Sequence, residues 1–421
     1  MTDVRALIDD HARAVEQDVI SWRHTLHEHP ELPNREEKTA AMVARHLTGL
    51  GFDTVRTGVA GHGVIGVLHG GDGDRVMGLR ADMDALPVKE LQDVPFRSTV
   101  VDEDYPDGPF PVAHMCGHDV HTAVLMGAAS VLAGLREHLP GTVKMIFQPA
   151  EEGPPITEDG GADLMVRDGA LENPRPDMMF VLHTSPFPAG MLNYSAGHAL
   201  ASSDYLSIRV EGQGVHGSTP WMGKDPMPVA AEIITALGQV YRQVPANDAM
   251  TISIGKVVDS GRFNVIGDGV ELIGTIRVLQ DEILDDVHAR VDRIASHVAA
   301  AHGLTATTTF RQHVPSVHND PAWLDRILPT ARRVMGDKHV QPSPPTLGYD
   351  DASLFVNPVG GAYMLLGGQD TEVADGRLQP VDGGRGLWPN HNPHFYFDDG
   401  VLVDGVRLHS HVTYDFLTGA I

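Results

Sequence analysis

Residues 119–147, DVHTAVLMGAASVLAGLREHLPGTVKMIF, decide the fold class of this 421-residue chain. The stretch up to residue 138 has the pattern of an apolar helix, and it leads into a strand of the buried type, Thr142–Phe147. Another strand pattern, Val76–Arg80, comes before the helix. Strand, helix and strand at this spacing indicate βαβ units and an α/β sheet with helices on both faces.

The pattern changes after about residue 199. Strand and helix patterns then follow one another over 203–210, 228–240, 250–258, 270–279 and 282–301. They predict a self-sufficient α+β module, a four-stranded antiparallel sheet with two helices. We therefore expect a discontinuous catalytic domain, 1–198 and 312–421, with a central mixed sheet flanked by helices. The module, 199–311, is inserted into it.

Composition excludes several classes of function. The 31 Lys and Arg against 56 Asp and Glu give a formal net charge of −25, which argues against binding to nucleic acid or to an anionic membrane surface. No segment approaches the roughly 18 consecutive apolar residues of a membrane span, and the N-terminus lacks the apolar stretch of a secretory signal. The single cysteine excludes an internal disulfide, so we expect a cytoplasmic protein.

Two carboxylates, Asp82 and Asp84, follow the strand Val76–Arg80 directly. The carboxyl end of a strand in an open α/β sheet is where ligands usually bind. A turn in which aspartate side chains bond to the backbone produces the same pattern, so both interpretations stay open here.

Residues 114–121, HMCGHDVH, combine a thiol with three imidazoles just before the apolar helix. Cys116 and His118 can both bind one cation or bridge two. Cys116 could otherwise be a small buried hydrophobe, or form a nucleophile pair with His118. If the segment binds metal, the side chains expected to support the ligands without binding the ion are Asp82, Asp84, Asp119 and His121.

Adjacent carboxylates, Glu151 and Glu152, follow the strand Thr142–Phe147. They point in different directions, so one could ligate a metal while the other serves as general base toward water. A Glu-Glu pair on a surface loop is the alternative interpretation. His183 closes another strand pattern, and residues 389–394, PNHNPH, offer a late histidine.

Taken together, these motifs resemble the hippurate hydrolase, aminoacylase and auxin-conjugate hydrolase family of dinuclear metallohydrolases. The resemblance covers essentially the whole chain. It begins at residues 23–32, RHTLHEHPEL, and is most specific at residues 116–123, CGHDVHTA.

The resemblance implies two divalent metal ions per subunit, with zinc, manganese, cobalt and nickel all compatible with the ligand set. The implied ligands are Cys116, His118, Glu152, His183 and His391. Glu151 matches the family's general base. His391 is chosen over His394 because the family's ligand stands two residues before the proline, here Pro393.

The inserted module resembles the family's lid, which pairs two subunits, so we expect a homodimer or a higher homo-oligomer. Within residues 214–220, GVHGSTP, His216 matches a histidine that reaches the partner's active site and polarises the scissile carbonyl. Asn264 and Arg277 match positions that stabilise the oxyanion and hold the substrate carboxylate.

The activity implied by the resemblance is metal-dependent hydrolysis of N-acyl amino acids carrying acetyl, benzoyl or other aryl or alkyl acyl groups. The products are a carboxylic acid and a free amino acid. The alternatives are a dipeptidase or another N-deacylase of the same fold, or a cysteine hydrolase that uses Cys116 with His118. The acyl preference carries over poorly, because residues 350–353 read DDAS where many relatives have Glu-Asp-Phe-Ser.

Overall fold

The structure, a computed structural model, describes residues 3–421 and divides into two compact units. The first unit comprises Met1–Gly197, His318–Ser343 and Leu354–Ile421, and the second comprises His198–Val317 and Pro344–Ser353. The second unit therefore holds more than the expected insertion, 199–311. Backbone hydrogen bonds attach the extra segment, Pro344–Ser353, to the rest of this unit. The N–H of Ala201 donates to the carbonyl of Gly348 at 2.8 Å, and the N–H of Thr346 donates to the carbonyl of Ala199 at 3.1 Å.

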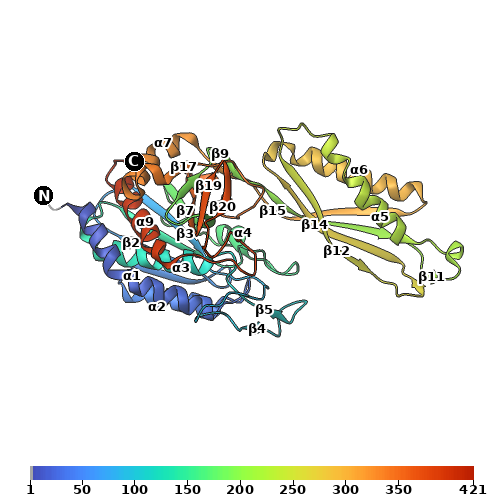
Figure 1. The fold of residues 1–421 in the computed structure, drawn as a ribbon, viewed down its shortest axis with the longest axis horizontal. Helices are drawn as coiled ribbons and strands as arrows, with labels where there is room; N and C mark the ends of the chain where they lie inside the picture. The colour runs from blue at the N-terminus through green and yellow to red at the C-terminus, as the bar shows by residue number, and fades with distance from the viewer. Residues whose placement is uncertain (1–2) are drawn as a thin grey trace. The chain divides into compact units, whose positions relative to one another are not determined.

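A mixed sheet lies at the centre of the first unit (Figure 1), and its eight strands follow the order β1-β2-β6-β3-β7-β18-β8-β17. Its strands are β1 (Thr54–Val59), β2 (Gly63–His69), β3 (Val76–Asp82), β6 (Thr142–Gln148), β7 (Met178–Pro188), β8 (Leu192–Tyr194), β17 (Val340–Pro342) and β18 (Gly361–Gln369). Strands β6, β3, β7 and β18 run parallel, so their carboxyl ends face the same edge. This sheet and the helices that flank it confirm the predicted α/β class.

Nearly every residue of helix α3 (His118–Gly134) is buried, which explains why the helix is apolar on nearly all sides. It contacts β3 and β7, and also helices α1 (Val4–Glu28) and α9 (Leu402–Leu417). A side chain at Gly127 would place its Cβ 2.6 Å from Val19 of α1 and 2.7 Å from Val406 of α9, so glycine permits this close packing. The packing fixes the first turn of α3 at the carboxyl edge of the sheet.

The remaining helices of the first unit are α2 (Glu37–Gly49), α4 (Gly161–Arg167), α7 (Pro321–Met335) and α8 (Ser353–Val359), of which Ser353 belongs to the second unit. Short strands form two hairpins, β4 (Val101–Asp102) with β5 (Phe110–Pro111), and β19 (Thr371–Ala374) with β20 (Arg377–Pro380). Two further short strands, β9 (Gly197–Leu200) and β16 (Val317–Asn319), each contain residues of both units. Across residues 3–421, no helix combines the length and apolar character needed to cross a membrane.

The second unit contains a four-stranded antiparallel sheet in the order β12-β14-β10-β15. Its elements are β10 (Ser203–Glu211), β12 (Met250–Asp259), β14 (Gly269–Val278), β15 (Thr305–Val314), and the helices α5 (Pro226–Leu237) and α6 (Leu284–Ala301). Alternate residues of β10, Leu206, Ile208 and Val210, are buried in one core with apolar residues of both helices. Period-two burial of this kind is typical of a strand with one buried face.

Candidate metal centre

Polar side chains from five segments gather at the carboxyl edge of the central sheet. Asp82 ends β3 and Asp84 follows it, Cys116 precedes α3 and His118 begins it, Glu151 and Glu152 follow β6, His183 lies in β7, and His391 comes from the loop before α9. Ligand atoms of these residues and of His121 form overlapping groups within 4.8 Å: Asp82, His118, His121 and His183; Cys116, Glu152 and His391; His118, Glu151 and Glu152. All five predicted ligands therefore lie in one cluster.

Gly117 allows the first turn of α3 to approach strand β7. Its φ is +90°, a left-handed conformation that favours glycine, and an added Cβ would lie 2.4 Å from Oγ1 of Thr184. That hydroxyl instead donates to the carbonyl of Cys116 at 2.7 Å. The thiol and the imidazole on either side of Gly117 are thus held over the sheet edge.

The imidazole of His118 lies at the middle of the cluster and is fully buried. Its Nδ1 lies 3.2 Å from Oδ1 of Asp84, and its Nε2 lies 3.6 Å from Oε2 of Glu151 and 3.8 Å from Oε1 of Glu152. Both Nε2 of His118 and Oε1 of Glu152 are buried without a hydrogen-bond partner among the described residues. Buried polar atoms are nearly always satisfied, so two unsatisfied atoms this close fit a cation between them.

Cys116, Glu152 and His391 form the second group of donors. Nε2 of His391 lies 3.2 Å from Oε1 of Glu152, and the backbone N–H of His391 donates to Met115 at 2.7 Å. His391 has a φ of +71°, an uncommon conformation for a residue other than glycine. The ring of His394 packs instead on Trp388, with 4.7 Å between the centroids. This geometry favours His391 as the late ligand.

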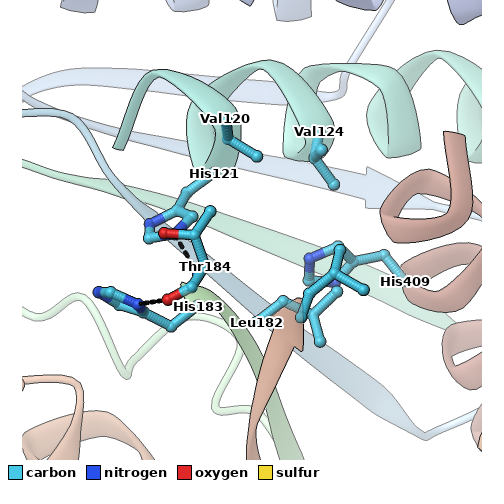
Figure 2. Close-up of a pocket in the computed structure, with 8 residues that line it drawn as sticks. Val120, His121, Val124, Leu182, His183, Thr184 and His409 are labelled. Atoms are coloured by element: carbon cyan, nitrogen blue, oxygen red, sulfur yellow. Dashed lines mark hydrogen bonds between the residues drawn. The ribbon is translucent and has the colours of Figure 1, made fainter. Parts of the chain in front are cut away.

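His183 does not end its strand, contrary to our expectation. Strand β7 continues to Pro188, while its pairing with β3 stops at Val181. His183 therefore lies two residues beyond the last pair between β7 and β3, while β3 stays paired with β6 as far as Asp82. Its Nδ1 donates to the carbonyl of Thr184 at 2.7 Å (Figure 2), which leaves Nε2 directed at the cluster, 3.7 Å from Sγ of Cys116.

Both ring nitrogens of His121 form hydrogen bonds, so His121 supports the cluster rather than offering a free ligand atom. Its Nε2 accepts the backbone N–H of Thr184 at 2.8 Å (Figure 2), so the proton of the neutral ring is on Nδ1, which donates to Oδ1 of Asp82 at 2.5 Å. Arg80 holds the other oxygen of Asp82 at 2.7 Å. His121 and Arg80 together fix the direction of the Asp82 carboxylate.

Asp119 is placed differently from our expectation. Neighbouring residues of a helix point about 100° apart, so the carboxylate of Asp119 turns away from His118. Its Oδ2 accepts hydrogen bonds from Arg23 at 3.1 Å and from His27 at 2.9 Å. Burial lowers the pKa of His27, but hydrogen bonds to Asp119 and Glu90 raise it to about 9, so the ring is a buried imidazolium. Asp119 therefore anchors α3 to α1 rather than supporting the ligands.

The surroundings of Cys116 are unsuitable for a free nucleophilic thiolate. Burial raises the pKa of this thiol well above its usual value, and the nearby Glu152 and Glu151 raise it further. Reactive cysteines lie in electropositive surroundings that lower the pKa. A divalent cation would stabilise the thiolate, and thiolate, imidazole and carboxylate donors together suit zinc and related metals. The donor set therefore fits a metal centre.

The second unit brings His216 and Asn264 together. His216 lies in β11 (Val215–His216), which pairs with β13 (Val265–Ile266), and the carbonyl of Asn264 accepts the N–H of Gly217 at 3.0 Å. The backbone N–H of Ser218 donates to Nδ1 of His216 at 3.1 Å. The neutral ring consequently carries its proton on Nε2, which is free to donate to an incoming oxygen.

Arg277 lies in β14, in the same unit. Its guanidinium is 4.6 Å from the ring centroid of Tyr349, and Nη1 donates to the carbonyl of Leu347 at 3.4 Å. No Asp or Glu among residues 3–421 forms an ion pair with it. A partly buried guanidinium of this kind can bind a carboxylate from outside the chain.

Comparison with known proteins agrees with this chemistry. Residues 78–415 match the model of peptidase family M20/M25/M40. The chain belongs to this family. Its M20 relatives include the N-acetylcysteine deacetylase of Bacillus subtilis, which is 33% identical over 388 residues, 91% of this chain and 93% of the relative. The hippurate hydrolase of Campylobacter jejuni is 31% identical over 398 residues, 94% of this chain and 95% of the relative.

A solved M20 structure extends the likeness to the whole fold. The YXEP protein of Bacillus subtilis, described as a dinuclear metal binding peptidase, has a TM-score of 0.73 and 28% identity. The match covers 96% of this chain and 99% of that protein. Membership of the M20 family and the donor cluster together identify the chain as a metal-dependent amidohydrolase.

Proposed function

We propose that this M20 protein hydrolyses the amide bond of N-acyl amino acids, releasing a carboxylic acid and a free amino acid. The observation that carries the proposal is the pair of unsatisfied buried atoms, Nε2 of His118 and Oε1 of Glu152, with Glu151 beside them. Relatives named for N-acetylcysteine and hippurate, both N-acyl amino acids, support the substrate class.

We assign two divalent metal ions to the cluster. The ligands would be Cys116, His118, Glu152, His183 and His391; Oε1 of Glu152 lies 3.8 Å from Nε2 of His118 and 3.2 Å from Nε2 of His391. When bound, such ions lower the pKa of water and polarise the carbonyl of the substrate. Asp84 fixes the ring of His118 through Nδ1 and thereby directs Nε2 at the ions.

Glu151 acts as the general base. Its carboxylate is buried at 4% exposure, and Oε2 lies 3.6 Å from Nε2 of His118, next to the ligands without belonging to the predicted set. It takes the proton of the attacking water and delivers it to the departing amine nitrogen. The side chain of the adjacent Glu152 points in another direction, so Glu151 can serve as the base while Glu152 serves as the metal ligand.

Residues of the second unit would complete the site of a partner in a homodimer. Nε2–H of His216 and the amide of Asn264 would donate to the oxyanion, each such donor contributing about 3 to 4 kcal/mol to the transition state. The guanidinium of Arg277 would bind the free carboxylate of the amino acid, which selects acyl amino acids over acyl amines.

Metal analysis followed by a substrate screen tests the proposal. The purified protein should contain metal and release amino acids from N-acetyl, N-benzoyl or N-indolylacyl amino acids. Dipeptides with a free amino terminus serve as the comparison. Cleavage of dipeptides alone would replace the proposal with a dipeptidase, and full activity after EDTA treatment would favour a thiol enzyme.

A further inference from the structure

Glu36 occupies the N-cap position of α2 without capping this helix. Its side chain makes no hydrogen bond to the first turn. Glu31 does so instead, since its carboxylate accepts the N–H groups of Lys38 at 3.1 Å and Thr39 at 2.9 Å. The side chain of Glu36 is completely buried and points elsewhere.

The carboxyl of Glu36 is bonded to the turn that follows β6. Its Oε1 accepts the backbone N–H of Ala150 at 2.7 Å and that of Asn34 at 3.1 Å. Its Oε2 is buried without a hydrogen-bond partner among the described residues. Burying a carboxyl group with one unsatisfied oxygen is costly, so the position of Glu36 against this turn needs a functional explanation.

Ala150 is the residue directly before Glu151 and Glu152, and it has a left-handed φ of +54°. Alternate amides of this turn are held by buried carboxyls from two different segments. The N–H of Ala150 donates to Glu36, and the N–H of Glu152 donates to Oδ2 of Asp84 at 2.9 Å. Glu151 lies between these two fixed points.

We propose that Glu36 is a positioning residue for the hydrolytic reaction. Its Oε1 holds Ala150 in the left-handed conformation and so directs Glu151 toward the reacting water and Glu152 toward the metal. Residues held in sparsely populated backbone conformations persist where the surrounding structure enforces them, often beside active sites. The inference rests on the role proposed for Glu151.

A pair of substitutions separates the hydrogen bond from the volume of the side chain. Glu36→Gln keeps an oxygen that can accept the N–H of Ala150, whereas Glu36→Met fills the space without an acceptor. In the metal-loaded enzyme, we expect Glu36→Met to lower kcat by about 10- to 100-fold with little change in KM or metal content. Glu36→Gln should stay near the parent.

Arg35→Ala is the matched control. Arg35 belongs to the same connection between α1 and α2, but its Nη2 binds Oε1 of Glu158 at 2.8 Å rather than the turn at Ala150. Its removal should leave kcat unchanged. A loss in Arg35→Ala equal to that in Glu36→Met would overturn the assignment, as would normal kcat in Glu36→Met or a collapse of kcat in Glu36→Gln.

Hydrogen exchange of the Ala150 amide gives a readout that needs no substrate. Exchange should be about 2- to 10-fold faster in Glu36→Met, the range for one lost hydrogen bond, and unchanged in Glu36→Gln. If Glu36→Met does not fold, Glu36→Asp replaces it: its shorter side chain cannot reach Ala150, so parental kcat and exchange there would contradict the proposal. Normal turnover in Glu151→Gln would refute the role of Glu151 alone, and the exchange result would still decide whether Glu36 holds the turn.

Discussion

The carboxylate of Asp84 links His118 to Glu152: Oδ1 lies 3.2 Å from Nδ1 of His118, and Oδ2 accepts the backbone N–H of Glu152 at 2.9 Å. One side chain therefore orients two proposed ligands from different segments. In Asp84→Asn, the amide can satisfy only one of these two donors. We expect metal affinity or kcat to fall by about 10- to 100-fold, measured by metal titration and steady-state kinetics.

Glu151→Gln should separate chemistry from metal binding. The amide cannot accept the proton of water, so kcat should fall by about 10²- to 10⁴-fold. Metal content should remain at the parent value because Glu152, rather than Glu151, is the proposed ligand. Elemental analysis beside the kinetics checks both parts, and a fully loaded variant with near-normal turnover would remove Glu151 from the mechanism.

His391→Ala and His394→Ala form a matched pair near the C-terminus. His391 lies 3.2 Å from Glu152, whereas the ring of His394 packs on Trp388. Alanine at 391 should lower metal content and activity together, and added metal should restore part of the activity. Alanine at 394 should keep its metal. The reverse pattern in elemental analysis would reassign the ligand.

A mixed dimer tests whether His216 acts on the partner's site. Glu151→Gln and His216→Ala should each be inactive alone. In a heterodimer, one site combines both substitutions and the other contains neither, so about half of the parent's activity should return. Co-expression with two affinity tags isolates this species. A heterodimer without activity would mean that His216 serves its own chain, and full activity of His216→Ala alone would mean that His216 has no catalytic role.

Stability should depend on pH through His27. Its folded-state pKa is raised to about 9, above the usual 6.5. Its contribution is therefore fully present below about pH 6.5 and is lost as pH rises through about 9, an effect of at most roughly 3 kcal/mol. In His27→Gln, the free energy of unfolding should change less over this interval. Equal pH slopes for the two proteins, measured by denaturant titration at fixed metal, would exclude this linkage.

The α/β class and the donor cluster were predictable because they depend on local patterns. The apolar run of α3 and the buried strands on both sides of it indicate a parallel sheet, and parallel strands bring their carboxyl ends to one edge. The same edge therefore brings together Cys116, His118, Glu152 and His183, even if the predicted ends of the strands are wrong by one or two residues.

Side-chain directions and long-range backbone contacts were not predictable in this way. Asp119 is next to a proposed ligand in sequence but turns to Arg23 and His27, because the helix rotates between neighbours. Glu36 gives no sequence signal of its bond to Ala150, which joins segments far apart in the chain. Residues 344–353 join the second unit through backbone pairing that no side-chain pattern reveals.

His391 differs from the other proposed ligands in its access to solvent. Its side chain is 53% exposed and stands on a loop, whereas that of Glu152 is 6% exposed and that of His118 is fully buried. Within the first unit, bulk solvent therefore reaches the donor cluster on the side of the His391 loop.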